Sequence, residues 1–418
     1  MGTKQSKTSK DNKGDKMIFS LATSKKLYKM GTKMLGSGAF GKVYPGRSIL
    51  NPDLQVAIKC YKKKDLFNDD IHSIEGEIKN LRSLDHPNIV KYFEAVEDTK
   101  HLFIITEFCH GQTLGKYINS HENSIMHEEE AAYIMEQLLS AVNHCHSNNI
   151  AHRDLKPDNI MVDKLSNVTI IDYGLSKLVS KTGSLKSQAG CPYFMAPEIL
   201  NENYNLKCDI WSLGVILYIM LSGYLPFPGE SEEEILENIL KGEIKFSESV
   251  WKNVSESAIH LISMMLSRKY KTRISAKGAL EHEWFSILKG ETTAHDIDNV
   301  DRDILESLQF FECESPFKKA VLNILVKMIP DDEYNELRLE FRKIDEDGDG
   351  MLWLNEMRDA FRATSQSLSD KDIQKIIQKL DFVGNKKINY TEFLVATIDR
   401  KVLKKTDLIK DLFKQFDA

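Results

Sequence analysis

The sequence predicts an α+β fold with two lobes, a small β-rich lobe and a large α-helical lobe, followed by an all-α domain. Three patterns lead to this prediction. Short apolar runs with β-branched residues start at Tyr28 and continue to about Cys109, which is typical of strands. Apolar residues at helical spacing follow at 128–148. Near the C-terminus, an acidic segment at 345–356 lies between two further stretches of helical periodicity.

Composition narrows the class of protein. A chain of 418 residues is too long for a single hydrophobic core and suits two or three domains. The net charge of -6 gives no general attraction to nucleic acid, so we expect no nucleic-acid partner. The six cysteines show no CxxC spacing, which argues against a disulfide framework or zinc site and favours a reducing compartment. We expect a monomer in the cytoplasm.

Residues 1–27 are polar and too poor in apolar side chains to form a core, so we expect a disordered leader. The opening Met1–Ser6 fits the pattern for N-myristoylation of Gly2. Five lysines stand at positions 4, 7, 10, 13 and 16. One myristoyl chain binds a membrane only marginally, and each lysine adds about 1 kcal/mol near an anionic leaflet. We therefore expect reversible membrane contact; the alternative is a disordered tail with a chance match.

A glycine-rich segment spans residues 35–43. Gly36, Gly38 and Gly41 have GxGxxG spacing, which lets backbone approach phosphate groups closely. A dinucleotide-binding turn uses the same spacing but leads into a helix, whereas here a strand-like run follows at 56–59. Nucleotide contacts are expected from Leu35, Gly36, Ser37, Gly38, Ala39, Phe40, Gly41 and Val43.

Pro45 does not suit the strand that should follow the glycines. Proline has no N–H to donate to a neighbouring strand and is rare inside sheets. We expect a bulge or an early strand end at this position.

The segment His152–Asn159, read together with Asp172–Gly174, carries the chemistry. It offers a carboxylate to receive a hydroxyl proton, a cation to neutralise a moving phosphoryl group, and oxygen ligands for Mg²⁺. Alone, such a string is equally consistent with a solvated turn. Preceded by the glycine loop and a strand lysine, it resembles the catalytic loop of the protein kinases.

This resemblance implies ATP as cofactor and a role for each matching residue. Asp154 is expected to accept the proton of the substrate hydroxyl and Lys156 to neutralise the transferred phosphoryl group. Asn159 and Asp172 are the expected Mg²⁺ ligands. The position of Lys156 resembles the serine/threonine branch, so protein serines and threonines are the expected substrates.

Other matching residues concern the nucleotide. Lys59 is expected to hold the α and β phosphates, oriented by Glu77; Glu75 is the alternative partner and more plausibly a surface carboxylate. The resemblance also implies that the backbone of Glu107 to Cys109 meets adenine.

Three further positions concern activation, substrate choice and the interior of the large lobe. Ser187 lies where kinases often carry an activating phosphate; the alternative, which we favour, is an ordinary loop serine. Thr113 stands where relatives that read basic residues commonly have a glutamate, so we expect a weaker demand for Arg or Lys in substrates. Arg273 is expected to pair with Glu198 in the interior.

The segment at 345–356 satisfies the EF-hand template. The side chains of Asp345, Asp347 and Asp349, the carbonyl of Met351 and a bidentate Glu356 are the expected Ca²⁺ ligands. Helices should flank it, at 334–344 and 355–364.

A second candidate loop at 381–392 is degenerate. Val383 occupies the third position and Lys386 replaces the usual glycine, so we expect weak or no Ca²⁺ binding and a structural pairing role. Residues 413–418 resemble the entry into a third hand, from which we expect a chain truncated before a second lobe; the alternative is a natural short relative.

Between these parts, Phe317–Ile329 has the pattern of an amphipathic helix with flanking lysines. Such a helix suits the groove of an open calmodulin-like lobe, and the alternative is a junction helix whose apolar face stays buried. We expect four segments: the leader at 1–27, a kinase domain at 28–285, an autoinhibitory junction at 286–330 and the EF-hand region at 331–418.

This order resembles the calcium-dependent protein kinases of plants and protists. It implies that Ca²⁺ binding to the EF-hands relieves autoinhibition of a serine/threonine kinase. A full switch needs about 5.5 kcal/mol of differential binding, so with one intact loop we expect weak calcium activation. The alternative is a calcium-binding pseudokinase scaffold, which would normally have lost Lys59, Asp154, Asn159 or Asp172.

Overall fold

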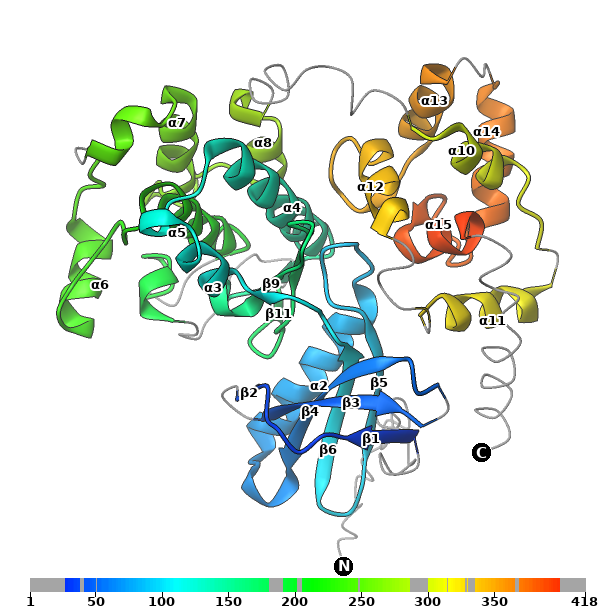
Figure 1. The fold of residues 1–418 in the computed structure, drawn as a ribbon, viewed down its shortest axis with the longest axis horizontal. Coiled ribbons are helices and arrows are strands. Elements are labelled where there is room, and N and C mark those ends of the chain that lie inside the picture. Colours follow the sequence, from blue (N-terminus) through cyan, green and yellow to red (C-terminus); the bar gives the residue numbers. More distant parts are fainter. Residues whose placement is uncertain are drawn as a thin grey trace, which may run out of the picture.

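The computed structural model describes residues 27–37, 41–49, 51–179, 191–200, 205–246, 249–285, 300–313, 315–327, 329, 335–364 and 368–398. It shows a small β lobe, a large helical lobe and a helical tail domain beside them, which confirms the predicted fold class (Figure 1). Within these residues, no helix has both the length and the apolar character needed to cross a membrane.

Several predictions lie outside the described residues. They concern the leader with Gly2, the glycine-loop residues Gly38, Ala39 and Phe40, the phosphosite candidate Ser187, and the partial third hand at 413–418.

The small lobe is an antiparallel sheet with one helix packed on it. The main strand order is β1-β3-β4-β6-β5, with β2 paired to β3. The strands are β1 (Tyr28–Met30), β2 (Gly36–Ser37), β3 (Lys42–Ser48), β4 (Gln55–Lys62), β5 (Tyr92–Glu97) and β6 (His101–Glu107), and the helix is α2 (Asn68–Ser83). Along β4, Val56 and Ile58 face away from α2, while Lys59 and Tyr61 face Glu77 of that helix.

The expected break at Pro45 is wrong. Strand β3 continues through Pro45, which pairs with Ala57 of β4 in unbroken register. The carbonyl of Pro45 accepts the N–H of Gly31 at 2.7 Å, just after β1 has ended at Met30. The backbone nitrogen and carbonyl of Pro45 therefore face the side of β1 and not β4. Because β1 has already ended there, the missing N–H removes no hydrogen bond between strands.

The large lobe is built around helix α5, whose residues are buried along almost its whole length. Its helices are α3 (Leu114–Asn119), α4 (Glu128–Ser147), α5 (Cys208–Ser222), α6 (Glu232–Lys241), α7 (Glu256–Met265) and α8 (Ala276–Leu280). Its short strands are β7 (Gln112–Thr113), β8 (Ile150–Ala151), β9 (Ile160–Val162), β10 (Val168–Ile170) and β11 (Lys177–Leu178). Single 3₁₀ turns lie at Lys63–Asp65, Glu122–Ser124, Pro157–Asn159, Pro192–Phe194 and Ser249–Asn253.

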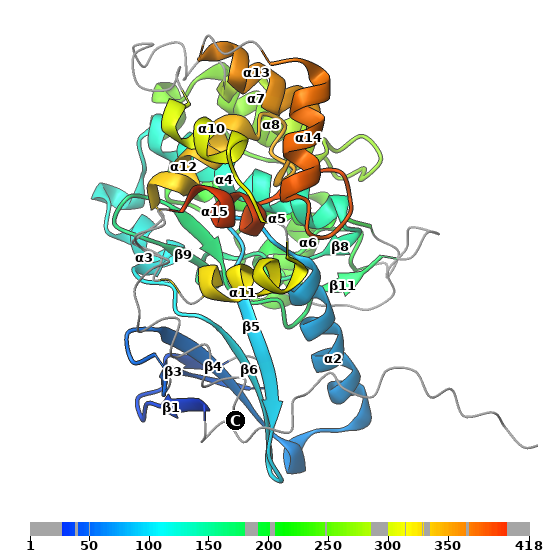
Figure 2. The same cartoon turned by 90° about the vertical axis from the view of Figure 1, so that its right-hand side faces the viewer.

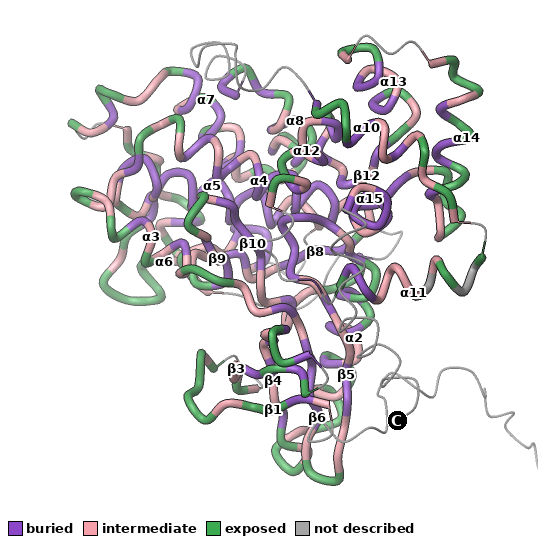
Figure 3. The backbone as a smooth tube through the Cα atoms, turned by 45° about the vertical axis from the view of Figure 1, so that its right-hand side comes forward, coloured by how far each residue is buried: buried purple, intermediate pink, exposed green. Residues whose placement is uncertain are grey.

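Local capping explains where several helices begin. Serine hydroxyls accept backbone N–H groups at the first turns of α6, α7 and α8, which satisfies donors that have no partner within the helix. Helix α4 instead begins with three glutamates, Glu128 to Glu130, whose charges suit the positive end of the helix dipole. The buried apolar residues of the large lobe, purple in Figure 3, belong to one hydrophobic cluster that includes residues of both α4 and α5.

The tail domain is a pair of helix-loop-helix units with its own core. Its elements are α10 (Arg302–Gln309), α11 (Pro316–Lys327), α12 (Asn335–Ile344), β12 (Met351–Leu352), α13 (Leu354–Ala363), α14 (Asp370–Leu380), β13 (Ile388–Asn389) and α15 (Tyr390–Thr397). The two loops meet through the antiparallel pair β12 and β13. Phe341, Phe361 and Phe393 are fully buried at its centre.

Helix α11 bridges the tail and the small lobe (Figure 2). Leu325 is buried against the face of the small-lobe sheet that carries Val56 and Ile58, with Val321 and Ile324 packed beside it. On another side, α11 contacts α15. The amphipathic helix expected from the sequence is thus present, with Leu325 buried on the sheet and Val326 buried in the tail core; an autoinhibitory role for the junction stays a prediction.

Candidate active site and calcium site

Lys59 lies at the centre of a buried ion-pair network. Its Nζ is 2.7 Å from Glu77 Oε1 and 2.8 Å from Asp172 Oδ1. Strand β4 supplies the lysine, helix α2 the glutamate, and the residues after β10 the aspartate. The structure therefore brings together three predicted residues from three separate segments, and it selects Glu77 over Glu75, which pairs with His72 on the surface.

The charges in this network support each other. Burial alone would raise the pKa of Asp172, but the charge of Lys59 and its hydrogen bond outweigh burial and lower the pKa to about 2. Burial likewise opposes the charged form of Lys59, yet Glu77 and then other neighbours raise its pKa well above the usual value. Both groups stay charged at neutral pH, as binding of phosphate and metal requires.

In the catalytic loop, two side chains bind the same carboxylate oxygen of Asp154. Lys156 Nζ lies 2.7 Å from Asp154 Oδ2, and Asn159 Nδ2 donates to the same oxygen at 2.9 Å and to the Asp154 carbonyl at 2.8 Å. Because the amide nitrogen of Asn159 is used in this way, its oxygen is the atom left for a cation. The predicted residues Asp154, Lys156 and Asn159 thus form one compact group.

Asp209 anchors this loop, a role that the sequence reasoning missed. The buried carboxylate accepts the N–H groups of His152 and Arg153, each at 2.9 Å, and it also contacts His146 Nε2 at 2.9 Å. These bonds hold Arg153 at a φ of 69°, a left-handed conformation that non-glycine residues rarely adopt. An aspartate at the start of a fully buried helix was the available signal.

The interior pair expected from the sequence is present. Arg273 donates to Glu198 through two nitrogens, at 2.5 Å and 2.8 Å, and both residues are buried. Tyr173 also finds a partner, because its hydroxyl lies 3.5 Å from Cys145 Sγ in the core.

The other described positions predicted to bind the nucleotide lie on and beside strands β2, β3 and β6 of the small lobe. Gly36 pairs with Val43, and the N–H of Leu35 donates to the Val43 carbonyl at 2.8 Å, which shapes the described part of the glycine loop. Ser37 and Gly41 are the described residues on either side of 38–40. At the other end of the sheet, Glu107 closes β6, and its side chain accepts the N–H of Lys91 at 2.8 Å. Cys109 follows, half-buried against the core.

The donor set fits Mg²⁺ with ATP. Asp172 is ionised, and the oxygen of Asn159 is available, which gives the two oxygen ligands that a kinase metal site supplies from protein. When bound, the metal neutralises charge on the phosphates, and Lys59 adds a further positive charge.

The first loop of the tail domain gathers its acidic residues. Carboxylate oxygens of Asp345, Asp347 and Asp349 lie within 4.8 Å of one another. Glu356, at the start of α13, accepts the N–H of Trp353 at 2.8 Å and that of Asp347 at 3.4 Å. Burial, then the charges of neighbouring carboxylates, raises the pKa of Asp345 well above normal, and burial raises that of Glu356 to about 7. A divalent cation compensates this repulsion, so the set fits Ca²⁺ with Met351 as carbonyl ligand.

Comparison with known proteins decides the family. Residues 30–285 match the protein kinase domain, and residues 334–398 match the EF-hand domain pair. The chain is 35% identical to calcium-dependent protein kinase 5 of Plasmodium berghei (strain Anka), over 94% of this chain and 69% of that protein. It is 36% identical to calcium-dependent protein kinase 4 of Plasmodium falciparum (isolate 3D7), over 93% of this chain and 76% of that protein.

The chain belongs to the calcium-dependent protein kinases. It is a calcium-regulated serine/threonine protein kinase that uses ATP, Mg²⁺ and Ca²⁺, as the sequence predicted. Nothing favours the pseudokinase alternative, since Lys59, Asp154, Asn159 and Asp172 are all in place.

In the second loop of this calcium-dependent protein kinase, the acidic side chains accept hydrogen bonds from the backbone of the loop itself. Asp381 accepts the N–H groups of Asn385 at 3.1 Å and Lys386 at 2.7 Å, among others. Glu392 accepts those of Phe382 at 2.6 Å and Asn389 at 2.8 Å. The predicted pairing role is confirmed, because β13 of this loop pairs with β12 of the first loop; weak or absent Ca²⁺ binding stays a prediction.

The first calcium loop is docked on helix α4 of the kinase domain. Ser140 and Asn143 donate to the Gly348 carbonyl, each at 3.3 Å, and His144 Nδ1 lies 2.7 Å from the Asp349 carbonyl. The N–H of Asp85 donates to His144 Nε2 at 3.3 Å, so the neutral ring carries its proton on Nδ1 and donates it to the loop.

Two further contacts extend this interface between the kinase domain and its tail. Asp347 Oδ2 pairs with Lys277 Nζ of α8 at 3.2 Å. In the second hand, Thr391 donates its N–H and its hydroxyl to the carboxylate of Asp85, at 3.1 Å and 2.9 Å. Sequence reasoning gave no sign of this interface, because Ser140, Asn143 and His144 of α4 look like ordinary helix positions.

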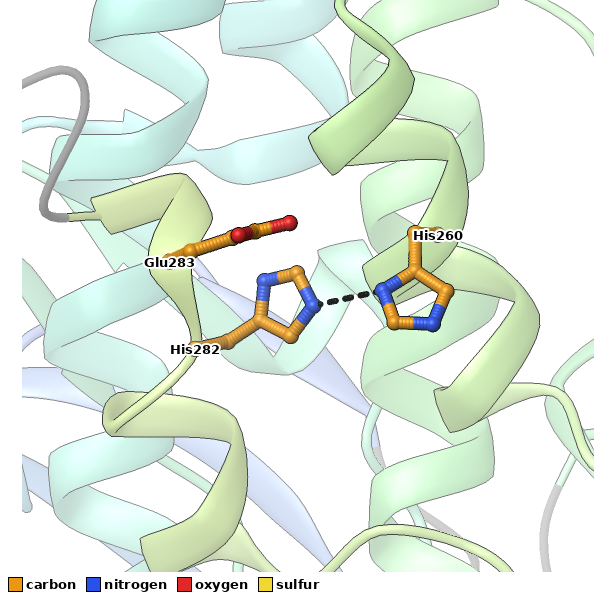
Figure 4. Close-up of side chains that lie close together, drawn as sticks. All are labelled: His260, His282 and Glu283. Carbon is orange, nitrogen blue, oxygen red and sulfur yellow. Dashed lines mark hydrogen bonds between the residues drawn. The ribbon is translucent and has the colours of Figure 1, made fainter.

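Another cluster with metal-ligand chemistry lies in the large lobe, formed by His260, His282 and Glu283 (Figure 4). His260 Nδ1 and His282 Nε2 face each other at 3.0 Å. The N–H of Trp284 donates to His282 Nδ1 at 3.2 Å, so the neutral His282 ring keeps its proton on Nε2. That proton already joins the two rings, and the nitrogens that would face a metal are therefore used in a hydrogen bond.

Proposed function

We propose that Asp154 takes the proton from the hydroxyl of a protein serine or threonine while Lys156 neutralises the transferred phosphoryl group. The observation that supports this is the fixing of Asp154 Oδ2 by Lys156 and Asn159, at 2.7 Å and 2.9 Å. We assign the other carboxylate oxygen, Oδ1, to the substrate hydroxyl. A carboxylate held in one orientation is what proton transfer at a fixed distance requires.

In the same proposal, Lys59 holds the α and β phosphates under the control of Glu77, and Asn159 and Asp172 hold Mg²⁺. The glycine loop from Leu35 to Val43 covers the phosphates. The backbone of Glu107 to Cys109 meets adenine, because β6 delivers this segment to the junction of the two lobes.

The test is phosphate transfer to a generic protein with Asp154→Asn, which keeps size and hydrogen bonds but removes the base. We expect transfer to fall by about 10²-fold or more, the usual range for a positioned acid or base. Asp65→Asn, the same change on an exposed residue of the small lobe, should keep normal transfer. Equal activity of both variants would refute the role of Asp154.

We also propose that Ca²⁺ acts through the docking of the first loop on α4. The contacts with α4 use the carbonyls of residues 347, 348 and 349, whereas the metal uses side chains and the carbonyl of Met351, so these contacts and the metal compete for no atom. Among the described contacts, only that with Lys277 of α8 shares a side chain, that of Asp347, with the metal. Helix α4 ends at Ser147 and leads through β8 directly to the catalytic loop. A loop ordered by Ca²⁺ therefore supports the kinase domain close to the catalytic residues, and linkage requires that docking in turn raises calcium affinity.

This coupling predicts the behaviour of Asn143→Ala. The buried amide donates to two loop carbonyls, at 3.3 Å each, and its loss should raise the Ca²⁺ concentration for half-activation about fivefold. Glu356→Gln, which weakens the metal site directly, should abolish activation. If Asn143→Ala left both calcium affinity and activation unchanged, docking would have no part in regulation. Within the described residues only the first loop gathers three aspartates whose carboxylate oxygens lie within 4.8 Å of one another, so we expect a Hill coefficient near one.

We further propose a cytoplasmic monomer that makes reversible membrane contact through a myristoylated Gly2 and the leader lysines. The support is the sequence pattern at Met1–Ser6 together with the basic charge that follows it. Incorporation of labelled myristate that Gly2→Ala abolishes, with binding to anionic but not neutral vesicles, is the expected result. No incorporation by a competent transferase would remove the anchor.

A further inference from the structure

Tyr61 lies beside the catalytic ion pair, and no step proposed above uses it. It follows Lys59 by two positions on β4, so both side chains point to the same face of the sheet. The side chain is only 1% exposed. Its hydroxyl donates to Glu77 Oε2 at 2.8 Å in the interior.

The carboxylate of Glu77 is thus held at both oxygens by two residues of one strand. Lys59 takes Oε1 at 2.7 Å and Tyr61 takes Oε2 at 2.8 Å. A single contact leaves a carboxylate free to rotate about its last bond, whereas two contacts fix its plane. Because Glu77 is buried, removal of the hydroxyl leaves an ionised oxygen without that donor, which is costly.

The ring of Tyr61 also reaches the glycine loop. A Cβ placed on Gly41 would lie 3.0 Å from Tyr61 Cε1, so the ring passes directly under the third glycine of the motif. Lys59 Nζ lies 5.7 Å from the ring centroid. The tyrosine therefore touches the loop that covers the phosphates and both members of the ion pair.

The hydroxyl is a dependable donor. Burial, followed by the charge of Glu77, raises the pKa of Tyr61 well above its ordinary value, so the proton stays on oxygen throughout the working range of a kinase.

We propose that Tyr61 is a positioning residue for phosphoryl transfer: it fixes the carboxylate of Glu77 and, through it, the Nζ of Lys59. This inference rests on the proposed role of the Lys59 and Glu77 pair. Tyr61 does not touch the reacting atoms, so its effect appears in how well Lys59 stabilises charge on the phosphates and not in protein-substrate binding.

The test is Tyr61→Phe, which removes one oxygen and keeps the ring. We expect kcat to fall about tenfold, as for the loss of one charge-assisted hydrogen bond, with the KM for the protein substrate unchanged within twofold. Tyr28→Phe is the matched control, because Tyr28 is also a buried tyrosine of the small-lobe sheet and donates to Glu94 Oε1 at 2.6 Å, away from the ion pair. It should lose thermal stability to a similar extent while keeping kcat within twofold.

A double-mutant cycle separates positioning from a general loss of structure. If Tyr61 acts through Glu77, then Tyr61→Phe should change kcat by less than twofold in a Glu77→Gln background. An equal, tenfold loss in both backgrounds would overturn the inference, as would an unchanged kcat for Tyr61→Phe alone beside a strongly impaired Glu77→Gln. Should Glu77→Gln itself keep full kcat, the role of Glu77 in the proposed function fails, and that outcome is distinct from the other two.

Discussion

Gly350 offers a quantitative test of the contact between the calcium loop and the kinase domain. It has a φ of 76°, and a Cβ at this position would lie 2.6 Å from His86 Cδ2 and 2.7 Å from His144 Nδ1. Gly350→Ala therefore carries two costs. The left-handed backbone costs a residue with a Cβ about 1–2 kcal/mol, and overpacking against the buried rings costs about 1–3 kcal/mol more.

Gly384 supplies a control for the backbone cost. It lies in the second loop with a φ of 82°, and a Cβ there would meet nothing within 4 Å. Gly384→Ala should therefore cost about 1–2 kcal/mol in its own loop and leave the interface intact.

The assay is hydrogen exchange of the Asp85 amide, which donates to His144 Nε2 at 3.3 Å beside the docked loop. In the absence of Ca²⁺, Gly350→Ala should speed exchange at this amide by about 5- to 150-fold, which corresponds to the overpacking cost of about 1–3 kcal/mol, while Gly384→Ala should not. If both variants changed exchange equally, the clash would be absent, and the docked arrangement described here would be wrong.

Three further predictions concern other parts of the molecule. Arg273→Ala should destabilise the large lobe by about 3–5 kcal/mol, read as a lower melting temperature, because its carboxylate partner is left buried and uncompensated. The pKa of Asp172 is lowered to about 2, so its pairing with Lys59 contributes stability above the ordinary pKa of about 3.9; this contribution should fade as the pH drops from about 4 through 2, and Lys59→Met should remove it from an acid titration. The indole N–H of Trp353 donates to Asp349 Oδ2 at 2.9 Å, so Ca²⁺ should change Trp353 fluorescence, and a calcium titration in which Trp353→Phe gives the same signal would contradict this.

Sequence reasoning succeeded where the chemistry is carried by short local patterns. Two such patterns are the loop from His152 to Asn159 and the acidic run at 345–356. Each is a short continuous segment, so the distance between residues along the sequence limits the distance between their side chains. The prediction that Glu77 and not Glu75 pairs with Lys59 is also confirmed. It depended on the sequence spacing usual in the kinase family and not on the chemistry of the two glutamates.

What the sequence could not give depends on contacts between distant segments. Nothing about Ser140 or His144 marks them as partners of a loop some 200 residues later, because buried polar residues on a helix have many possible uses. Pro45 misled for a related reason, since the cost of a proline depends on which neighbouring strand its nitrogen faces. Tyr61 was within reach, because a tyrosine two positions after Lys59 must point to the same side of the strand.

The burial of Leu325 on the small-lobe sheet affects how a fragment of this protein would behave in solution. In a recombinant fragment ending at Phe285, the apolar surface around Val56 and Ile58 that α11 covers would be exposed to solvent. Such a fragment should self-associate unless this surface is made polar, whereas a cut placed after α11 would leave the covering helix attached. Self-association of the shorter fragment, seen as a larger particle by light scattering, would show that the segment joining the catalytic and calcium-binding parts also keeps the kinase domain soluble.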